Sequence, residues 1–133
     1  GTVMNDLREC VLVVDDEVLI AELWCMILED MGLEVCGQAA TAEAAVAMAK
    51  AHRPKVVLMD VRLRGQQDGV DAALAIHENV GSKVIFITGS KEASTAARIR
   101  LDHPVAVLFK PVSDRQLQSA VRAAMAEPAK GQS

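Results

Sequence analysis

The stretch VLVVDDEVLI, residues 11–20, contains the transition that decides the fold. Four apolar residues, typical of a strand buried on both faces of a sheet, run directly into Asp15, Asp16 and Glu17, and apolar residues then resume. Like charges at this spacing repel one another, and burial adds a desolvation cost. The stretch therefore predicts the end of a buried strand at which another group offsets the charge of the acid pair.

The composition is that of one soluble domain. The 133 residues are 51% hydrophobic and 24% charged, and with only 2% aromatic residues the core must be aliphatic. A net charge of -4 argues against a general nucleic-acid binder, and no apolar run approaches the roughly 20 residues of a membrane span. The cysteines Cys10, Cys25 and Cys36 lie among apolar neighbours without metal-site spacing, and we expect buried free thiols in a cytoplasmic protein.

Five short apolar runs predict five strands. They are rich in Val, Ile and Leu and nearly continuous, as in strands of a parallel sheet that is covered on both faces. The segments between them are too long for hairpins and long enough for helical crossovers. The predicted strands are Cys10 to Val14, Glu34 to Ala39, Val56 to Met59, Val84 to Ile87 and Val105 to Phe109.

The segments between these runs predict helices. The first has an apolar face with helical spacing and ends at Gly32, and the last begins with a capping-box pair, Ser113 and Gln116, and ends before Pro128. The first apolar face comprises Ile20, Leu23, Trp24, Ile27, Leu28 and Met31. The other predicted helices are Ala42 to His52 behind Thr41, Val70 to Asn79, and Glu92 to Leu101.

These elements predict a doubly wound α/β fold: a five-stranded parallel sheet with five helices, forming a three-layer α/β/α sandwich. We expect the domain to cover residues 10–126, with an N-terminal extension at 1–9 and a short polar tail at 127–133.

Chemically active side chains follow four of the five predicted strands. Asp15 and Asp16 follow the first, Asp60 the third, Thr88 the fourth and Lys110 the fifth. The carboxyl ends of parallel strands meet at one edge, where such sheets bind ligands. Clustered carboxylates require a compensating cation, and hard oxygen ligands suit Mg²⁺. A carboxylate can also accept a phosphoryl group while a lysine neutralises its oxygens.

Together these residues resemble the receiver domain of bacterial two-component response regulators. That family has an acid pair after the first strand, a phosphoryl-accepting Asp after the third, Thr or Ser after the fourth and Lys-Pro after the fifth. The matching residues here are Asp15-Asp16, Asp60, Thr88 and Lys110-Pro111. The resemblance extends from Cys10 to about Ala126 and implies the flavodoxin-like strand order 2-1-3-4-5.

The resemblance also implies a role for each residue. Asp16, Asp60 and the backbone carbonyl of Arg62 would bind Mg²⁺ directly, and Asp15 would do so mainly through water. Asp60 would take a phosphoryl group from a sensor histidine kinase or a histidine phosphotransfer protein. The Lys110–Pro111 peptide bond would be cis.

The chain departs from the family pattern at two places. Val107 stands where the family commonly has Tyr or Phe, and Phe109 lies on the same face of the strand by alternation. The loop VRLRGQQDG at residues 61–69 lacks the usual Met-Pro. Arg62 and Ser90 occupy positions where the family tunes the lifetime of the phosphoryl group. The segment FITG, residues 86–89, resembles a subgroup of stand-alone receivers without the switch aromatic.

Each residue also has an ordinary structural explanation. The macrodipole of a helix favours acids at its N-terminus, and Asp68-Gly69 is expected to form a turn rather than a ligand.

A haloacid-dehalogenase-like phosphatase would need its nucleophile after the first strand and a second Asp at position 62, where Arg62 stands. A nicotinamide-binding domain would need Gly-x-Gly-x-x-Gly in place of DDE.

We therefore predict a switch rather than a turnover enzyme. Phosphorylation would shift the face formed by the fourth helix, fifth strand and fifth helix and so change binding to a downstream protein target. A homodimer through this face, and a pseudo-receiver that binds partners without being phosphorylated, remain open alternatives.

Overall fold

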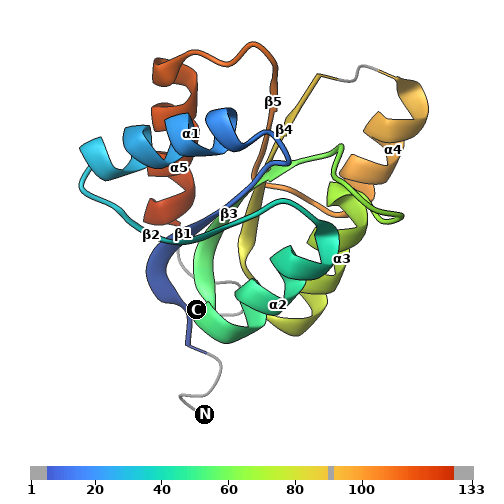
Figure 1. Cartoon of the computed structure of the whole chain (residues 1–133), viewed down its shortest axis with the longest axis horizontal. Coiled ribbons are helices and arrows are strands. Elements are labelled where there is room, and N and C mark those ends of the chain that lie inside the picture. The colour runs from blue at the N-terminus through green and yellow to red at the C-terminus, as the bar shows by residue number, and fades with distance from the viewer. Residues whose placement is uncertain (1–5, 90–91, 128–133) are drawn as a thin grey trace.

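The computed structural model describes residues 6–89 and 92–127. Five strands alternate with five helices along the chain (Figure 1). The strands are β1 (Arg8–Val14), β2 (Glu34–Ala39), β3 (Pro54–Asp60), β4 (Lys83–Thr88) and β5 (Ala106–Phe109). The helices are α1 (Val18–Asp30), α2 (Ala42–His52), α3 (Gly69–Asn79), α4 (Ala93–Leu101) and α5 (Asp114–Ala126).

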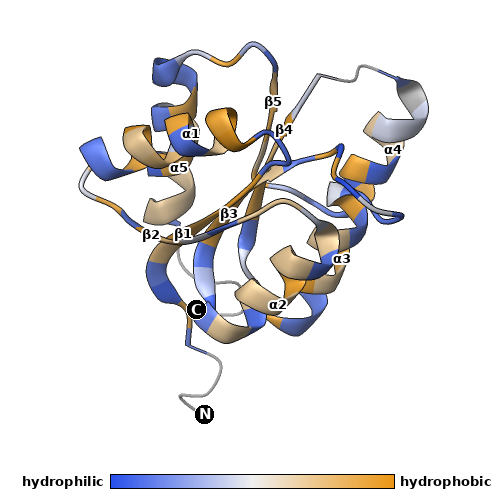
Figure 2. Ribbon diagram, in the orientation of Figure 1, coloured by the Kyte–Doolittle hydropathy of each residue, from blue (hydrophilic) through white to orange (hydrophobic). Residues whose placement is uncertain are grey.

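The strands form one parallel sheet in the order β2-β1-β3-β4-β5, which confirms the predicted topology. Both faces of β1 and β3 are buried because helices cover each side, which explains why their sequences are apolar runs rather than alternating patterns. In Figure 2 the central strands are coloured mainly as hydrophobic, whereas hydrophobic and hydrophilic residues alternate along the helices. In the described part of the chain, every helix is too short or too polar to cross a membrane.

Two apolar clusters fill the space on either side of the sheet. On one side, α1 and α5 pack against alternate residues of β1, β3 and β4, with Trp24 and Leu28 from α1 and Leu117 from α5. On the other side, α2 and α3 pack against the intervening residues, and Ile99 of α4 joins them. The alternation of side chains along each strand thus sends the apolar residues in the middle of β1, β3 and β4 to the two clusters in turn.

Side-chain caps start two helices where the sequence indicated. The Thr41 hydroxyl accepts a hydrogen bond from the Ala44 amide at 3.1 Å. Ser113 and Gln116 form the predicted capping box, in which each side chain accepts a hydrogen bond from the other's backbone amide. These contacts satisfy amides that the first helical turn leaves without a partner.

The expectation of a turn at Asp68-Gly69 was wrong. Asp68 is the N-cap of α3: its Oδ1 accepts hydrogen bonds from the amides of Val70 and Asp71, at 3.0 and 3.1 Å. The Asp71 carboxylate accepts a hydrogen bond from the Asp68 amide at 2.9 Å, which completes a second capping box. Gly69 is accordingly the first residue of the helix.

Several element boundaries differ from the sequence-based expectation. β1, β3 and β4 begin earlier, at Arg8, Pro54 and Lys83, because polar residues and proline at a strand entrance do not read as an apolar run. Leu23, assigned to the buried face of α1, is 47% exposed. Cys10 and Cys25 are buried, as expected, whereas Cys36 is only partly buried; all three are free thiols. Glu92 is the N-cap of α4 rather than its first residue, and β5 begins at Ala106.

Candidate functional site at the carboxyl edge of the sheet

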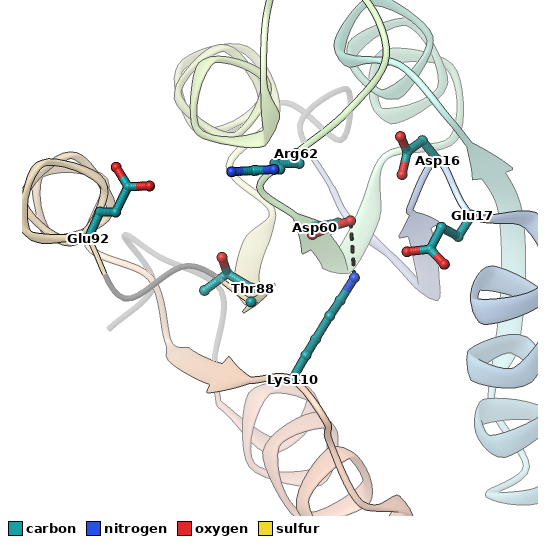
Figure 3. Close-up of a pocket in the computed structure, with 8 residues that line it drawn as sticks. Asp16, Glu17, Asp60, Arg62, Thr88, Glu92 and Lys110 are labelled. Carbon is teal, nitrogen blue, oxygen red and sulfur yellow. Dashed lines mark hydrogen bonds and ion pairs between the residues drawn. The ribbon is translucent and has the colours of Figure 1, made fainter.

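An open pocket of ≈ 580 Å³ lies at the carboxyl edge of the sheet. Asp60 ends β3 and Thr88 ends β4 within it, and Lys110 follows β5 (Figure 3). The residues that line the pocket are Asp16, Glu17, Asp60, Arg62, Thr88, Gly89, Glu92 and Lys110. The parallel sheet therefore gathers in one place the chemically active residues that the sequence distributes over four strand ends.

Three carboxylates at this edge of the sheet, two lining the pocket and one buried beside it, lie close enough to share one cation. Asp15, Asp16 and Asp60 each offer an oxygen within 4.8 Å of the others. Asp15 and Asp60 are almost fully buried, at 2% and 5% exposure, whereas Asp16 is partly exposed and faces the pocket. The Glu17 amide donates a hydrogen bond to Oδ1 of Asp15 at 2.8 Å and fixes that side chain. The residues thus fit a hard divalent cation that keeps some of its water.

The Lys110 ammonium partly neutralises the carboxylates of Asp60 and Asp15. Its Nζ lies 3.2 Å from Oδ2 of Asp60 and 3.5 Å from Oδ2 of Asp15. Burial opposes the charge of this ammonium, but the carboxylates of Asp60 and Asp15 raise the pKa of Lys110 above its usual value. The lysine is therefore fully charged near neutral pH.

The carboxylate of Asp60 remains short of positive charge. Burial, and then the neighbouring charge of Asp15, raise the pKa of Asp60 to about 6, although Lys110 opposes that shift. The ionised carboxylate of Asp60 is therefore destabilised, and a cation bound in the pocket would stabilise it.

The peptide bond between Lys110 and Pro111 is cis, as the resemblance implies. The Lys110 amide donates a hydrogen bond to the carbonyl of Thr88 at 2.9 Å and so joins the ends of β4 and β5. Thr88 is 2% exposed and lines the pocket across from Asp16 (Figure 3). Arg62, two residues beyond Asp60, lines the pocket as well.

Gly69 approaches the site more closely than any side chain would allow. A Cβ at this position would collide with the carbonyl oxygen of Asp60. The Gly69 amide donates a hydrogen bond to the Val61 carbonyl at 2.7 Å, which closes the loop that follows the central acid. The sequence-based interpretation missed this residue, and the Asp-Gly pair was the signal available to find it.

Val107, at the position of the family's aromatic residue, and Phe109, its neighbour on the same strand face by alternation, have different surroundings. Val107 is partly buried and packs against the cluster beneath α2, α3 and α4. Phe109, paired with Thr88 in the sheet, is 45% exposed. Phe109 therefore does not fill the interior position of the missing aromatic. Pro111 is exposed, and Ser90 lies outside the described residues.

Comparison with known proteins identifies the family. The family model "Response regulator receiver domain" matches residues 11–122. The chain belongs to the response regulator receiver family. The receiver of a modulated diguanylate cyclase from Desulfovibrio desulfuricans superposes with a TM-score of 0.83 at 34% identity, covering 90% of this chain and 94% of that one. A CheY-like receiver protein from Methanospirillum hungatei gives a TM-score of 0.81 at 27% identity, with the same coverage of 90% and 94%.

Longer regulators are similar to this receiver. Transcriptional regulatory protein PdtaR of Mycobacterium tuberculosis is 32% identical over 115 residues, which cover 86% of this chain and 56% of PdtaR. Response regulator UvrY of Escherichia coli is 32% identical over 114 residues, which cover 84% of this chain and 52% of UvrY. The chain thus spans about half the length of these curated relatives.

Proposed function

We propose that this receiver accepts a phosphoryl group on Asp60, with Mg²⁺ as cofactor, and so switches its affinity for a partner protein. The observation that carries the proposal is the arrangement around Asp60. Its carboxylate lies at an open pocket, 3.2 Å from the Lys110 ammonium and within metal-sharing distance of Asp15 and Asp16.

The transfer requires an in-line attack by a carboxylate oxygen of Asp60 on phosphorus. The oxygen–phosphorus bond forms while the bond from phosphorus to the donor breaks. With a phosphohistidine donor the ring nitrogen keeps the electron pair and takes up a proton; with an acyl phosphate a carboxylate leaves. Lys110 stands where it neutralises charge on the transferred oxygens, and the Thr88 hydroxyl is placed to donate a hydrogen bond to one of them.

The donor set fits a magnesium ion because it consists of carboxylate oxygens at an open pocket. Asp16 and Asp60 are the proposed direct ligands, together with the Arg62 carbonyl, and the buried Asp15 supports them. When bound, the ion supplies charge neutralisation for the incoming phosphoryl group.

The proposed phosphodonor is a histidine on a sensor kinase or a phosphotransfer protein. The helix that begins next to the acid pair exposes apolar side chains: Leu19 is 79% exposed, Met26 60% and Leu23 47%. Apolar residues of this size on a solvent-facing surface favour protein contact. A donor protein bound on α1 would place its histidine near Asp16 and Glu17 at the pocket entrance.

The proposed output surface is formed by α4, β5 and α5, with a downstream protein or another domain of a longer regulator as target. Val107 lies outside the chemical site, packed in the apolar cluster. Val107→Ala should therefore leave Mg²⁺ binding and phosphorylation unchanged. Loss of both in this variant would place residue 107 inside the site and contradict the assignment.

Incubation with Mg²⁺ and a small acyl phosphate, followed by intact-mass measurement, tests the phosphoryl acceptor. The wild-type protein should gain one phosphoryl group that Asp60→Asn does not gain. Asp30→Asn is the matched control, because Asp30 is an exposed acid at the far end of α1. No adduct with acyl phosphate or with a phosphorylated kinase would favour the pseudo-receiver, and continuous turnover of phosphate esters would favour a phosphatase.

A further inference from the structure

The Lys110 ammonium lies over the face of the Trp24 ring. Its Nζ is 5.8 Å from the ring centroid, within the range of a cation–π interaction. The chain has one tryptophan, two phenylalanines and no tyrosine. The single tryptophan of the chain therefore lies against the lysine of the proposed phosphorylation site.

The indole is a fixed surface. Trp24 is 5% exposed and is packed in the cluster between α1, α5 and the sheet. Leu108 and Val112, on either side of Lys110 in the sequence, pack against the same cluster. The ring therefore cannot move away from the lysine without a rearrangement of the core.

Lysine, in contrast, has a flexible four-carbon stem and loses rotamer entropy when it is held in place. The side chain of Lys110 is 28% exposed, so it could adopt several conformations if no other group held it. The carboxylates of Asp60 and Asp15 attract the ammonium from one side, and the electron-rich face of the indole attracts it from another. Together they restrict the ammonium to a small region beside Asp60.

We propose that Trp24 is a positioning residue for phosphoryl transfer: its indole face holds the Lys110 ammonium where it neutralises the group transferred to Asp60. This inference rests on the proposed function. It assigns a task in the site to α1, which begins just after the acid pair, because this helix would orient the Lys110 ammonium.

The test compares Trp24→Leu, which removes the ring, with Trp24→Phe, which keeps an aromatic face. A cation–π contact of about 0.5–1 kcal/mol corresponds to a loss of roughly 2–5-fold in the maximal rate of phosphorylation by acyl phosphate for Trp24→Leu. Trp24→Phe should recover most of that rate, and the half-saturating concentration of acyl phosphate should stay unchanged in both variants. The control is Leu28→Ala, which creates a cavity in the same cluster. Equal slowing by Leu28→Ala would show that only core packing matters and would overturn the proposal.

A double-mutant cycle separates positioning from general damage. In a Lys110→Met background, Trp24→Leu should cause no further slowing, because the group on which it acts is absent. An additional 2–5-fold loss there would contradict the inference.

A second readout does not depend on phosphorylation. In nuclear magnetic resonance spectra, the Lys110 ε-methylene protons should show an upfield ring-current shift that Trp24→Leu removes and Trp24→Phe partly keeps. If wild-type protein takes no phosphoryl group although this shift is present, the proposed function fails while the lysine–indole geometry stands. Absence of the shift in wild-type protein would overturn the positioning role itself.

Discussion

Two charged clusters lie near the carboxyl edge of the sheet, and they are built in opposite ways. In the pocket, Lys110 faces the buried carboxylates of Asp15 and Asp60. In the second cluster, Arg98 of α4 donates hydrogen bonds to both carboxylate oxygens of Asp68, at 2.8 and 3.1 Å, and to Asp71 at 3.3 Å. In the first cluster, burial and then the charge of Asp15 raise the pKa of Asp60 to about 6. In the second, burial opposes the shift, but hydrogen bonds from Arg98 and the backbone lower the pKa of Asp68.

The difference shows which cluster can bind something. The carboxylates of Asp68 and Asp71 are already satisfied by a bidentate guanidinium and by helix-capping amides, so this cluster is a closed structural bridge. In the pocket cluster, Asp15 and Asp60 are buried and one lysine only partly balances their charge, so an added cation would stabilise them.

The bridge between Asp68 and Arg98 also attaches α4 to the N-terminus of α3. Ile99 is the one buried residue among the described side chains of α4, whereas α1 buries five. Asp68 ends the loop that begins after Asp60, so the bridge connects that loop with the proposed output surface. A helix held by so little apolar area is suited to move.

The largest expected effect is that Asp60→Asn stabilises the metal-free protein. A folded-state pKa of about 6, against an ordinary value of 3.8 for this carboxyl, means that the ionised acid costs stability above pH 6. The gain in free energy of unfolding should reach at most about 3 kcal/mol above pH 6 and vanish as pH falls below about 4. Urea denaturation at pH 4, 5, 6 and 7.5 measures it. A variant less stable than wild type at pH 7.5 would show that the pocket is not short of positive charge.

The next effect is stabilisation of wild-type protein by Mg²⁺. At ten times the dissociation constant the gain should be about 1.4 kcal/mol, because the ion binds only the folded state. Thermal unfolding with and without MgCl₂ checks this, with Asp60→Asn and Asp16→Asn expected to respond much less. An equal response in Asp68→Asn protein is expected, since that acid belongs to the closed bridge. If Asp68→Asn abolished the response to Mg²⁺, the ion would bind at the Asp68 cluster and not in the pocket, which would contradict the assignment.

A smaller effect is expected from the bridge itself. Arg98→Gln should cost less than about 1 kcal/mol, because Arg98 and Asp68 are both partly exposed, and the cost should shrink in high salt. Asp68→Asn keeps a capping side chain but removes the charge, so it isolates the ion pair from the cap. The contribution of the pair should be present above the unfolded pKa of Asp68 and be lost as pH falls through its lowered folded value. A double-mutant cycle in urea at low and high salt measures it, and zero coupling at low salt would contradict it.

The smallest effect is local. Because the bridge is one of the few attachments of α4, Arg98→Gln should speed amide hydrogen exchange in α4 (Ala93–Leu101) while exchange in α1 stays unchanged. Leu28→Ala provides the reverse comparison and should affect α1 first. Uniform acceleration over both helices by Arg98→Gln would mean that α4 is not separately attached.

Much of the fold could be predicted from local patterns. Apolar runs marked the strands, and the alternation of strands with helical segments determined the doubly wound class. Asp15, Asp60, Thr88 and Lys110 follow predicted strands, and their proximity could be predicted from the parallel sheet alone. The haloacid-dehalogenase and nicotinamide-binding alternatives were weakened by residue order alone, and the family match then confirmed the receiver interpretation.

Side-chain environments could not be predicted in the same way. Asp68 reads as a turn residue in the sequence, yet it caps α3 through local hydrogen bonds with the amides of Val70 and Asp71. Only its ion pair with Arg98, 30 positions further along the chain, depends on tertiary structure. Leu23 fits the apolar spacing of α1 but faces solvent, since neighbouring elements and not the spacing decide which arc of a helix is covered.

The sequence by itself determined the element order, the parallel sheet and the identity of the acids, threonine and lysine at its edge, because these depend on residue types at short, regular spacings. Only the tertiary structure decided that Lys110 contacts Asp15 across 95 positions and lies over Trp24, and that Asp60 has its pKa raised to about 6. The physical reason is that burial and distance between charges are properties of the packed chain, and electrostatic energies depend on both.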